Sequence, residues 1–133
     1  MTIEKKDRED LILYRLEQAE ETIKDVKLLI YNDRLRSAIN RIYYGMFYSL
    51  LALGLANEFE TSKHTQLIGW FNKTFIHGGL IDPKYGKIIN KAYNRRTKGD
   101  YDIYVEFEKG IVLGMFDEMK EFISAIKSYL GKN

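Results

Sequence analysis

The stretch RLRSAINRIYYGMFYSLLALGLA, residues 34–56, decides the fold of this 133-residue chain. It is apolar nearly all the way round a helix, and such a helix belongs in the interior of a protein. The uncharged run Ile42 to Asn57 is shorter than the roughly 20 apolar residues that span a bilayer. We therefore expect a buried central helix, capped by residues 32–33, and no membrane association.

Long amphipathic helices are predicted on both sides of this central helix. From Asp10 to Ile30, and again from about Ile103 to Leu130, apolar residues recur at steps of three and four, which places them on one helical face. These faces comprise Ile12, Leu16, Ala19, Ile23, Val26 and Ile30 in the first helix, and Val112, Met115, Met119, Phe122, Ile126 and Tyr129 in the last.

Two further helices are predicted between the central and the final helix. The hydroxyl residues at 61–62 can cap the first of them, and the glycine pair at 78–79 can end it. The Asp-Pro pair at 82–83 opens the second, which reaches Arg96 before the segment 98–100 breaks it. No segment alternates as a half-buried strand does. We predict an all-α, four- to five-helix up-and-down bundle, with residues 1–133 in a single domain.

The composition sets limits on the function. A hydrophobic content of 45% is enough for one packed core, and the absence of cysteine excludes disulfides and thiolate metal sites. The charged segment 1–10 lacks the apolar stretch of a secretory signal, so a cytoplasmic location is expected. The net charge is only +2, so any contact with nucleic acid must come from a local patch. Neither His64 nor His77 has a carboxylate three or four residues after it, so no metal site is expected. No cofactor is expected either.

The fourth predicted helix carries an arginine on its apolar face. Arg96 follows Tyr85, Ile89 and Ala92 on one stripe, where an unpaired charge would be costly, and Asp100 is the obvious partner. The pair is either a structural ion pair at a helix end or part of a functional site, and both interpretations remain open.

A ridge of basic residues runs along the neighbouring face of the same helix. It could follow a phosphate backbone, although such a ridge is more often a solvated surface. Its members are Lys84, Lys87, Lys91, Arg95 and Lys98.

Polar residues interrupt the central helix at Asn40 and Arg41, on or next to the stripe that carries Tyr44. Buried polar groups need partners. They either fix the register of the bundle by hydrogen bonding, or line the same cleft as Arg96 and stack a base. His64, near a predicted helix start, could serve as a general acid or base, but a lone histidine there is more often a capping or surface residue.

Three stretches resemble the HEPN superfamily, in a branch of small prokaryotic proteins. They are RSAINRIYYGMFY at 36–48, SKH at 62–64 and RTKGDY at 96–101. The resemblance implies a helical bundle that forms a homodimer. It also implies a partner, a minimal nucleotidyltransferase protein, with the two sometimes acting as toxin and antitoxin. Many relatives are metal-independent RNases.

In those RNases an arginine, followed by a histidine with four to six residues between, lies at the dimer cleft. Arg96 matches the arginine, but Tyr101, Asp102 and Ile103 stand where the histidine would be. The Asp-Tyr pair that stands there instead, Asp100-Tyr101, is itself a feature in which this chain resembles the branch. The expected catalytic residues are Arg96, Asp100 and Tyr101, and the expected nucleotide- or RNA-binding residues are Arg41, Tyr44, Lys91 and Arg95.

The sequence thus predicts a toxin-like component that acts on RNA or nucleotides alongside a nucleotidyltransferase. It is a metal-independent RNase or a degenerate relative of one. The alternative is a non-catalytic module that binds a nucleotide or neutralises a partner. A third interpretation is a purely structural bundle whose polar residues only set the register of the helices.

Overall fold

The chain folds as helices joined by short connections. The computed structural model describes residues 4–102 and 106–132, and for Tyr101 the backbone only. Within these residues there is no strand. The elements are α1 (Lys5–Tyr31), α2 (Leu35–Ala56), α3 (His64–Phe71), which continues into the π-helical turn η1 (Asn72–Ile76), α4 (Lys84–Tyr101) and α5 (Lys109–Leu130).

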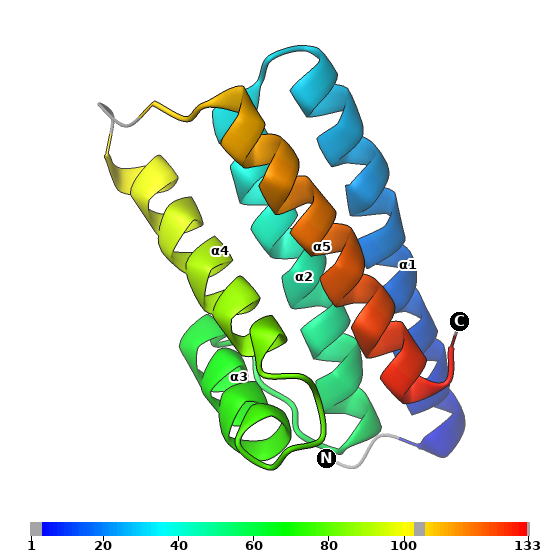
Figure 1. Ribbon diagram of the computed structural model, residues 1–133. Helices are drawn as coiled ribbons and strands as arrows, with labels where there is room; N and C mark the ends of the chain where they lie inside the picture. Colours follow the sequence, from blue (N-terminus) through cyan, green and yellow to red (C-terminus); the bar gives the residue numbers. More distant parts are fainter. Residues whose placement is uncertain (1–3, 103–105, 133) are drawn as a thin grey trace.

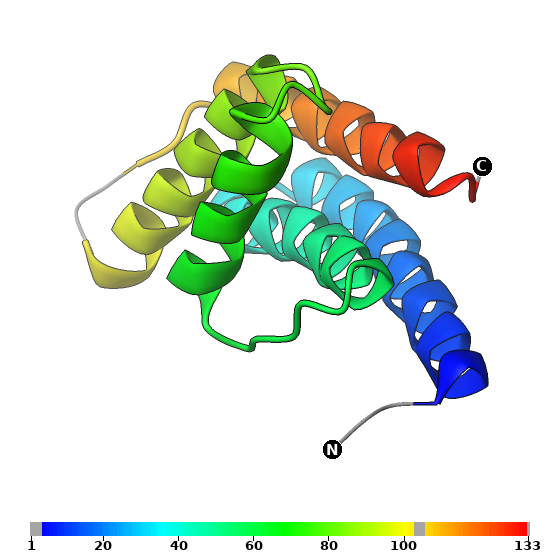
Figure 2. The same ribbon diagram turned by 90° about the horizontal axis from the view of Figure 1, so that it is seen from below.

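The four long helices run alongside one another and alternate in direction, as Figure 1 shows. α1 and α4 run one way, α2 and α5 the other, and the short α3 lies beside the first turns of α4 (Figures 1 and 2). The predicted all-α, up-and-down bundle is therefore confirmed.

The helix predicted to be central is central. α2 packs against α1, α3, α4 and α5, and its apolar side chains form the middle of the core. On the predicted faces of α1 and α5, Ile23 is only partly buried and Tyr129 is 44% exposed, but the other members are buried. The period of three and four residues predicted these two faces correctly, because both helices turn one stripe toward α2 or toward each other.

The predicted break in the fourth helix is wrong. α4 continues through 98–100 and ends at Tyr101. Two contacts stabilise this last turn: the ion pair between Arg96 and Asp100, one turn apart, and a hydrogen bond from the Arg36 guanidinium of α2 to the carbonyl of Gly99. Arg36 also donates to the carbonyl of Asp102, at 3.2 Å. An arginine from another helix thus satisfies carbonyls that a helix end leaves without partners, and the glycine does not end the helix.

The final helix begins later than predicted. Its first residue is Lys109, residues 106–108 are not helical, and the predicted start at Ile103 lies outside the described residues. Phe107 packs against the core and lies close to Gly99, so the chain stays extended there to cover the end of α4.

The helix caps and stops predicted around α3 and α4 are present in part. Gly79 has a φ of 73°, the left-handed conformation expected after a helix. Asp82 Oδ1 accepts a hydrogen bond from the backbone N–H of Lys84, at 3.0 Å, as a capping residue does. The residues at 61–62 do not cap α3, which begins at His64 without a side-chain cap; Thr61 instead accepts from the Lys63 N–H.

Gly54 permits a close approach near the end of α2. A Cβ at this position would lie 2.6 Å from the backbone carbonyl oxygen of Phe59, in the connection to α3. A backbone atom cannot rotate away as a side-chain end can. The glycine is therefore required where the chain folds back over α2.

We expect Gly54→Ala to lower the free energy of unfolding by about 1–3 kcal/mol, because the added methyl group displaces the connection. Gly114→Ala is the matched control, since Gly114 lies within α5 and its added Cβ would meet nothing within 4 Å. That change should stabilise the protein by about 0.5–1 kcal/mol through the higher helix propensity of alanine. Thermal and urea unfolding measure both values, and equal stability of the two variants would contradict this account of Gly54.

Candidate functional site

Arg96 lies between α4 and α2 and is held by groups from both. Its Nη2 donates a hydrogen bond to the Tyr44 hydroxyl, at 3.1 Å, and its Nε lies 2.9 Å from Oδ2 of Asp100. The Nε–H does not point at that oxygen, so the ion pair lacks an aligned hydrogen bond. The Arg96 side chain is 18% exposed and that of Asp100 is 31% exposed. Arg96 is thus largely buried but not sealed from solvent.

Tyr44 brings a second arginine to the same place. The guanidinium carbon of Arg41 lies 4.8 Å from the centroid of the Tyr44 ring, and that of Arg96 lies 5.4 Å from it. Arg41 also donates to the side-chain oxygen of Asn40, beside it on α2, at 3.2 and 3.3 Å. Both contacts of Arg41 are with residues of its own helix, α2. Because they do not join α2 to another helix, they favour a position in a cleft over a role in fixing the register of the bundle.

A hollow of about 450 Å³ opens next to these arginines, between α1, α2 and α4. It is lined by Leu29, Arg36, Ser37, Asn40, Arg41 and Asp100. Arginine, amide and hydroxyl groups are suited to binding phosphate oxygens, because each offers a hydrogen-bond donor. The hollow therefore brings together Arg41 and Asp100, and Arg96 and Tyr44 lie beside it.

His64, the first residue of α3, joins the same cluster. Its Nδ1 lies 2.6 Å from the Tyr43 hydroxyl, and its ring stacks on Phe47 with centroids 4.1 Å apart. The rings of Tyr43 and Tyr44 lie near both His64 and Arg96, at 5.4–5.7 Å from their centroids. His64 and Arg96 are thus neighbours in space, although 31 residues separate them in the sequence.

The surroundings of this cluster shift two pKa values. Burial, and to a lesser degree the charge of Arg96, lowers the pKa of His64 below its usual value near 6.5. Burial raises the pKa of the Tyr43 phenol, although the charge of Arg96 acts in the opposite direction. At neutral pH His64 is therefore neutral and Tyr43 keeps its proton.

Sequence reasoning left His64 out of the expected site. The signal was present, because the stretch at 62–64 was one of the three that carried the family resemblance. The separation of His64 and Arg96 along the chain hid their proximity, which depends on how α3 and α4 pack against the same tyrosines of α2.

The basic ridge of α4 is partly neutralised by α5. Lys91 pairs with Glu118, at 3.0 Å, and Lys84 pairs with Glu121. The glutamates come from another helix, so the sequence of α4 alone does not reveal them. For Arg95, the described residues supply no ion-pair partner. The ridge lies on a different face of α4 from Arg96, and Lys91 is thus separated from the cluster around Tyr44.

The predicted site residue Tyr101 is the last residue of α4, and its side chain lies outside the described residues. Of the other predicted site residues, the structure brings together Arg41, Tyr44, Arg96 and Asp100. Lys91 points toward α5 instead.

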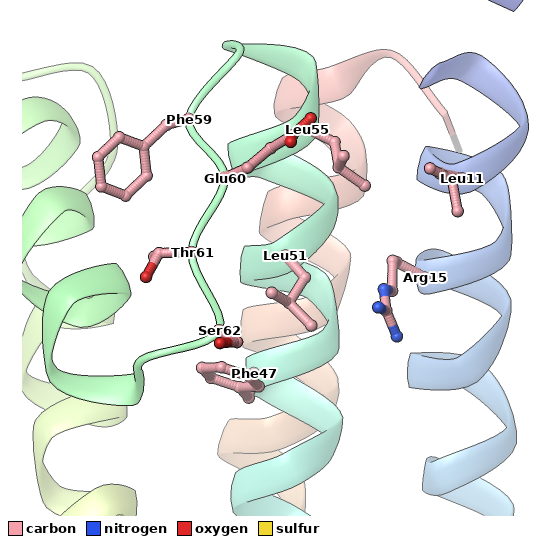
Figure 3. Close-up of a pocket in the computed structure, with 9 residues that line it drawn as sticks. All are labelled: Leu11, Arg15, Phe47, Leu51, Leu55, Phe59, Glu60, Thr61 and Ser62. Atoms are coloured by element: carbon pink, nitrogen blue, oxygen red, sulfur yellow. The ribbon is translucent and has the colours of Figure 1, made fainter. Parts of the chain in front are cut away.

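A second, more apolar groove of about 440 Å³ has Phe47 in its lining (Figure 3). Figure 3 shows Leu51 and Leu55 of α2 facing Leu11 and Arg15 of α1 across it. The connection from Phe59 to Ser62 forms its remaining wall, and Phe59 stacks on Trp70 of α3. Arg15, Thr61 and Ser62 supply hydrogen-bond donors here too, but most of the lining is apolar, and none of the predicted site residues lines this groove.

Within residues 4–102 and 106–132, no three side chains of His, Asp or Glu gather as metal ligands would. In the same residues, no helix combines the length and the apolar character that crossing a membrane requires.

Comparison with known proteins gives consistent matches. A family model described as "HEPN domain" matches residues 12–129. A "UPF0332 protein" of Thermotoga maritima is 38% identical over 93% of this chain and 94% of its own length. "Putative toxin MJ0605" of Methanocaldococcus jannaschii is 40% identical over 72% of this chain and 72% of its own length. "Putative toxin MJ0142" of the same organism is 33% identical over 86% of this chain and 78% of its own length.

We expect the imidazole of His64 to titrate below pH 6.5, and its pKa to rise in Arg96→Gln. The substitution removes a positive charge that disfavours the imidazolium. NMR titration of the His64 imidazole signals in the wild type and in Arg96→Gln measures both values. A wild-type value at or above 6.5, or no shift in the variant, would contradict the described cluster.

Proposed function

Since this chain belongs to the HEPN domain family, we propose that it is a toxin-like protein that acts on RNA or nucleotides and cleaves RNA without a metal. The observation that carries this proposal is Arg96. Its guanidinium is anchored by the Tyr44 hydroxyl and remains partly open to solvent beside a hollow rich in hydrogen-bond donors. Two relatives bear names that contain the word toxin, which supports the same proposal.

Arg96 is suited to binding the phosphate at the cleavage site. A planar guanidinium can donate two parallel hydrogen bonds to phosphate oxygens, and it stabilises the negative charge that builds up as the phosphate reacts. Asp100 lies beside it without an aligned hydrogen bond, so a phosphate can replace the carboxylate at a modest cost. Asp100 then serves to hold the arginine in position when the site is empty.

The proposal includes two partners. The first is a second copy of the chain, which would place Arg96, Asp100 and Tyr101 of both protomers around one basic cleft. The partial exposure of Arg96 is compatible with such a cleft. The second is a minimal nucleotidyltransferase protein, which would control the activity. We also propose that residues 1–133 form one domain that acts in the cytoplasm.

A second function is supported by a different observation. The spacing after Arg96 that holds a histidine in metal-independent RNases of this superfamily holds Tyr101, Asp102 and Ile103 instead. Without an acid-base residue the same hollow would bind a nucleotide, or neutralise a partner, without cutting RNA. This is the competing proposal that an assay of cleavage must separate from the first.

We expect the wild-type protein to cleave single-stranded RNA in the presence of a metal chelator, and Arg96→Ala to be slower by about 10²-fold or more, because it lacks the phosphate-binding group. Arg96→Lys should be impaired as well, since it keeps the charge but lacks the planar pair of donors. Gel analysis of the RNA, with light scattering for the oligomeric state, provides the measurement.

Thermal melts must accompany this assay, because losing one partner of a largely buried ion pair can also destabilise the fold. Lys27→Ala, an exposed substitution on α1, is the control that should leave cleavage unchanged. If the wild type binds RNA and Arg96→Ala weakens binding, but neither cleaves, the non-catalytic module is the correct function. If Arg96→Ala only lowers the melting temperature, Arg96 is structural.

We also expect Arg95→Ala to weaken RNA binding more than Lys91→Ala does. Lys91 already pairs with Glu118, so less of its charge is available to a phosphate backbone. Losing one phosphate contact should also reduce the slope of log affinity against log salt by about 1. Binding measured over a range of salt concentrations tests this, and equal effects of the two variants would place both residues outside the RNA-binding surface.

A further inference from the structure

We infer that His64 is the acid-base residue of this site, and that Tyr43 positions it to accept the proton of an RNA 2′-hydroxyl. The inference rests on the proposed function, because it names the group that the cleavage reaction needs and that the sequence after Arg96 does not supply.

The first argument is position. His64 and Arg96 come from different helices, α3 and α4, and both lie against the rings of Tyr43 and Tyr44. A phosphate held by Arg96 therefore lies near the imidazole. This is the arrangement that an arginine and a histidine one turn or more apart on a single helix would produce, but here two helices provide it.

The second argument is orientation. The Nδ1 atom of His64 is bonded to the buried Tyr43 hydroxyl, and the ring is held flat against Phe47. The two nitrogens of an imidazole point away from each other, so Nε2 faces away from Tyr43. Among the described residues, none forms a hydrogen bond with Nε2. The Tyr43 hydroxyl oxygen can accept a hydrogen bond from Nδ1–H, and this tautomer leaves the lone pair of Nε2 available as a base.

The third argument is protonation. Among the described residues, Arg96 and the phenols of Tyr43 and Tyr44 are the ionisable groups beside His64. Behind them, Tyr93 lies against Tyr43, and Asp100 pairs with Arg96. Burial and Arg96 keep the imidazole neutral at neutral pH, which a base requires. Arg96 thus acts on both reactants: it binds the phosphate and favours the basic form of His64.

The resulting reaction is balanced. Nε2 takes the proton of the 2′-hydroxyl while the 2′-oxygen forms a bond to the neighbouring phosphorus, and the bond from phosphorus to the 5′-oxygen breaks. The products are a 2′,3′-cyclic phosphate and a 5′-hydroxyl. Water supplies the proton of the leaving oxygen, and His64 returns its proton to the solvent.

The decisive experiment compares His64→Asn with His77→Asn. Asparagine can still hydrogen-bond to Tyr43 from near the position of Nδ1 but has no counterpart of Nε2. We expect His64→Asn to bind RNA and melt as the wild type does, and to cleave it about 10²-fold or more slowly. His77 is exposed, and His77→Asn should cleave normally. An RNA with a single 2′-deoxynucleotide at the cleavage position should stay intact at that position.

Tyr43→Phe tests the positioning role. It removes the hydroxyl and keeps the buried ring, so we expect slower cleavage together with a change in the ¹⁵N chemical shifts of His64, which report the tautomer. If Tyr43→Phe is folded and cleaves at the wild-type rate, Tyr43 does not position His64 for the reaction. If His64→Asn is folded and cleaves at the wild-type rate, the inference is overturned and the proposed function stands. If the wild type leaves every RNA intact, the nuclease proposal is overturned, and the inference with it.

Discussion

The structure depends on the burial of α2, which packs against every other α-helix of the described chain. A helix in that position must be apolar on all sides to form the core, and α2 is apolar along most of its length. The exceptions are concentrated in the half that carries Asn40, Arg41, Tyr43 and Tyr44. Because polar groups in such a place need partners, neighbouring helices bring theirs to the same point, and the candidate site forms there.

The two tyrosines connect the other helices to this point in different ways. The Tyr43 hydroxyl binds His64 at the start of α3, and the Tyr44 hydroxyl binds Arg96 near the end of α4. The rings supply the packing of a core residue, and the hydroxyls supply directed contacts that a phenylalanine cannot make. One pair of neighbouring residues therefore determines where the imidazole and the guanidinium lie relative to each other.

Several parts of this arrangement could be predicted from the sequence, because they involve residues close together in the chain. Arg96 and Asp100 are one helical turn apart, and so are Ser37 and Arg41, which line one hollow. The ion pairs of Lys84 and Lys91 could not be predicted in the same way. Their glutamates lie on α5, and the pairing depends on the rotation of one helix against another, to which many residues contribute.

The sequence by itself determined the helical class, the central place of α2 and the apolar faces of α1 and α5, because helical periodicity is a local property of the chain. It also indicated Asp100 as the partner of Arg96, although it placed Asp100 beyond the end of that helix. Only the tertiary structure decided that α4 extends past Gly99, since Arg36 of α2 stabilises its end. It alone decided that His64 lies beside Arg96, because that contact requires α3 and α4 to pack against the same two tyrosines.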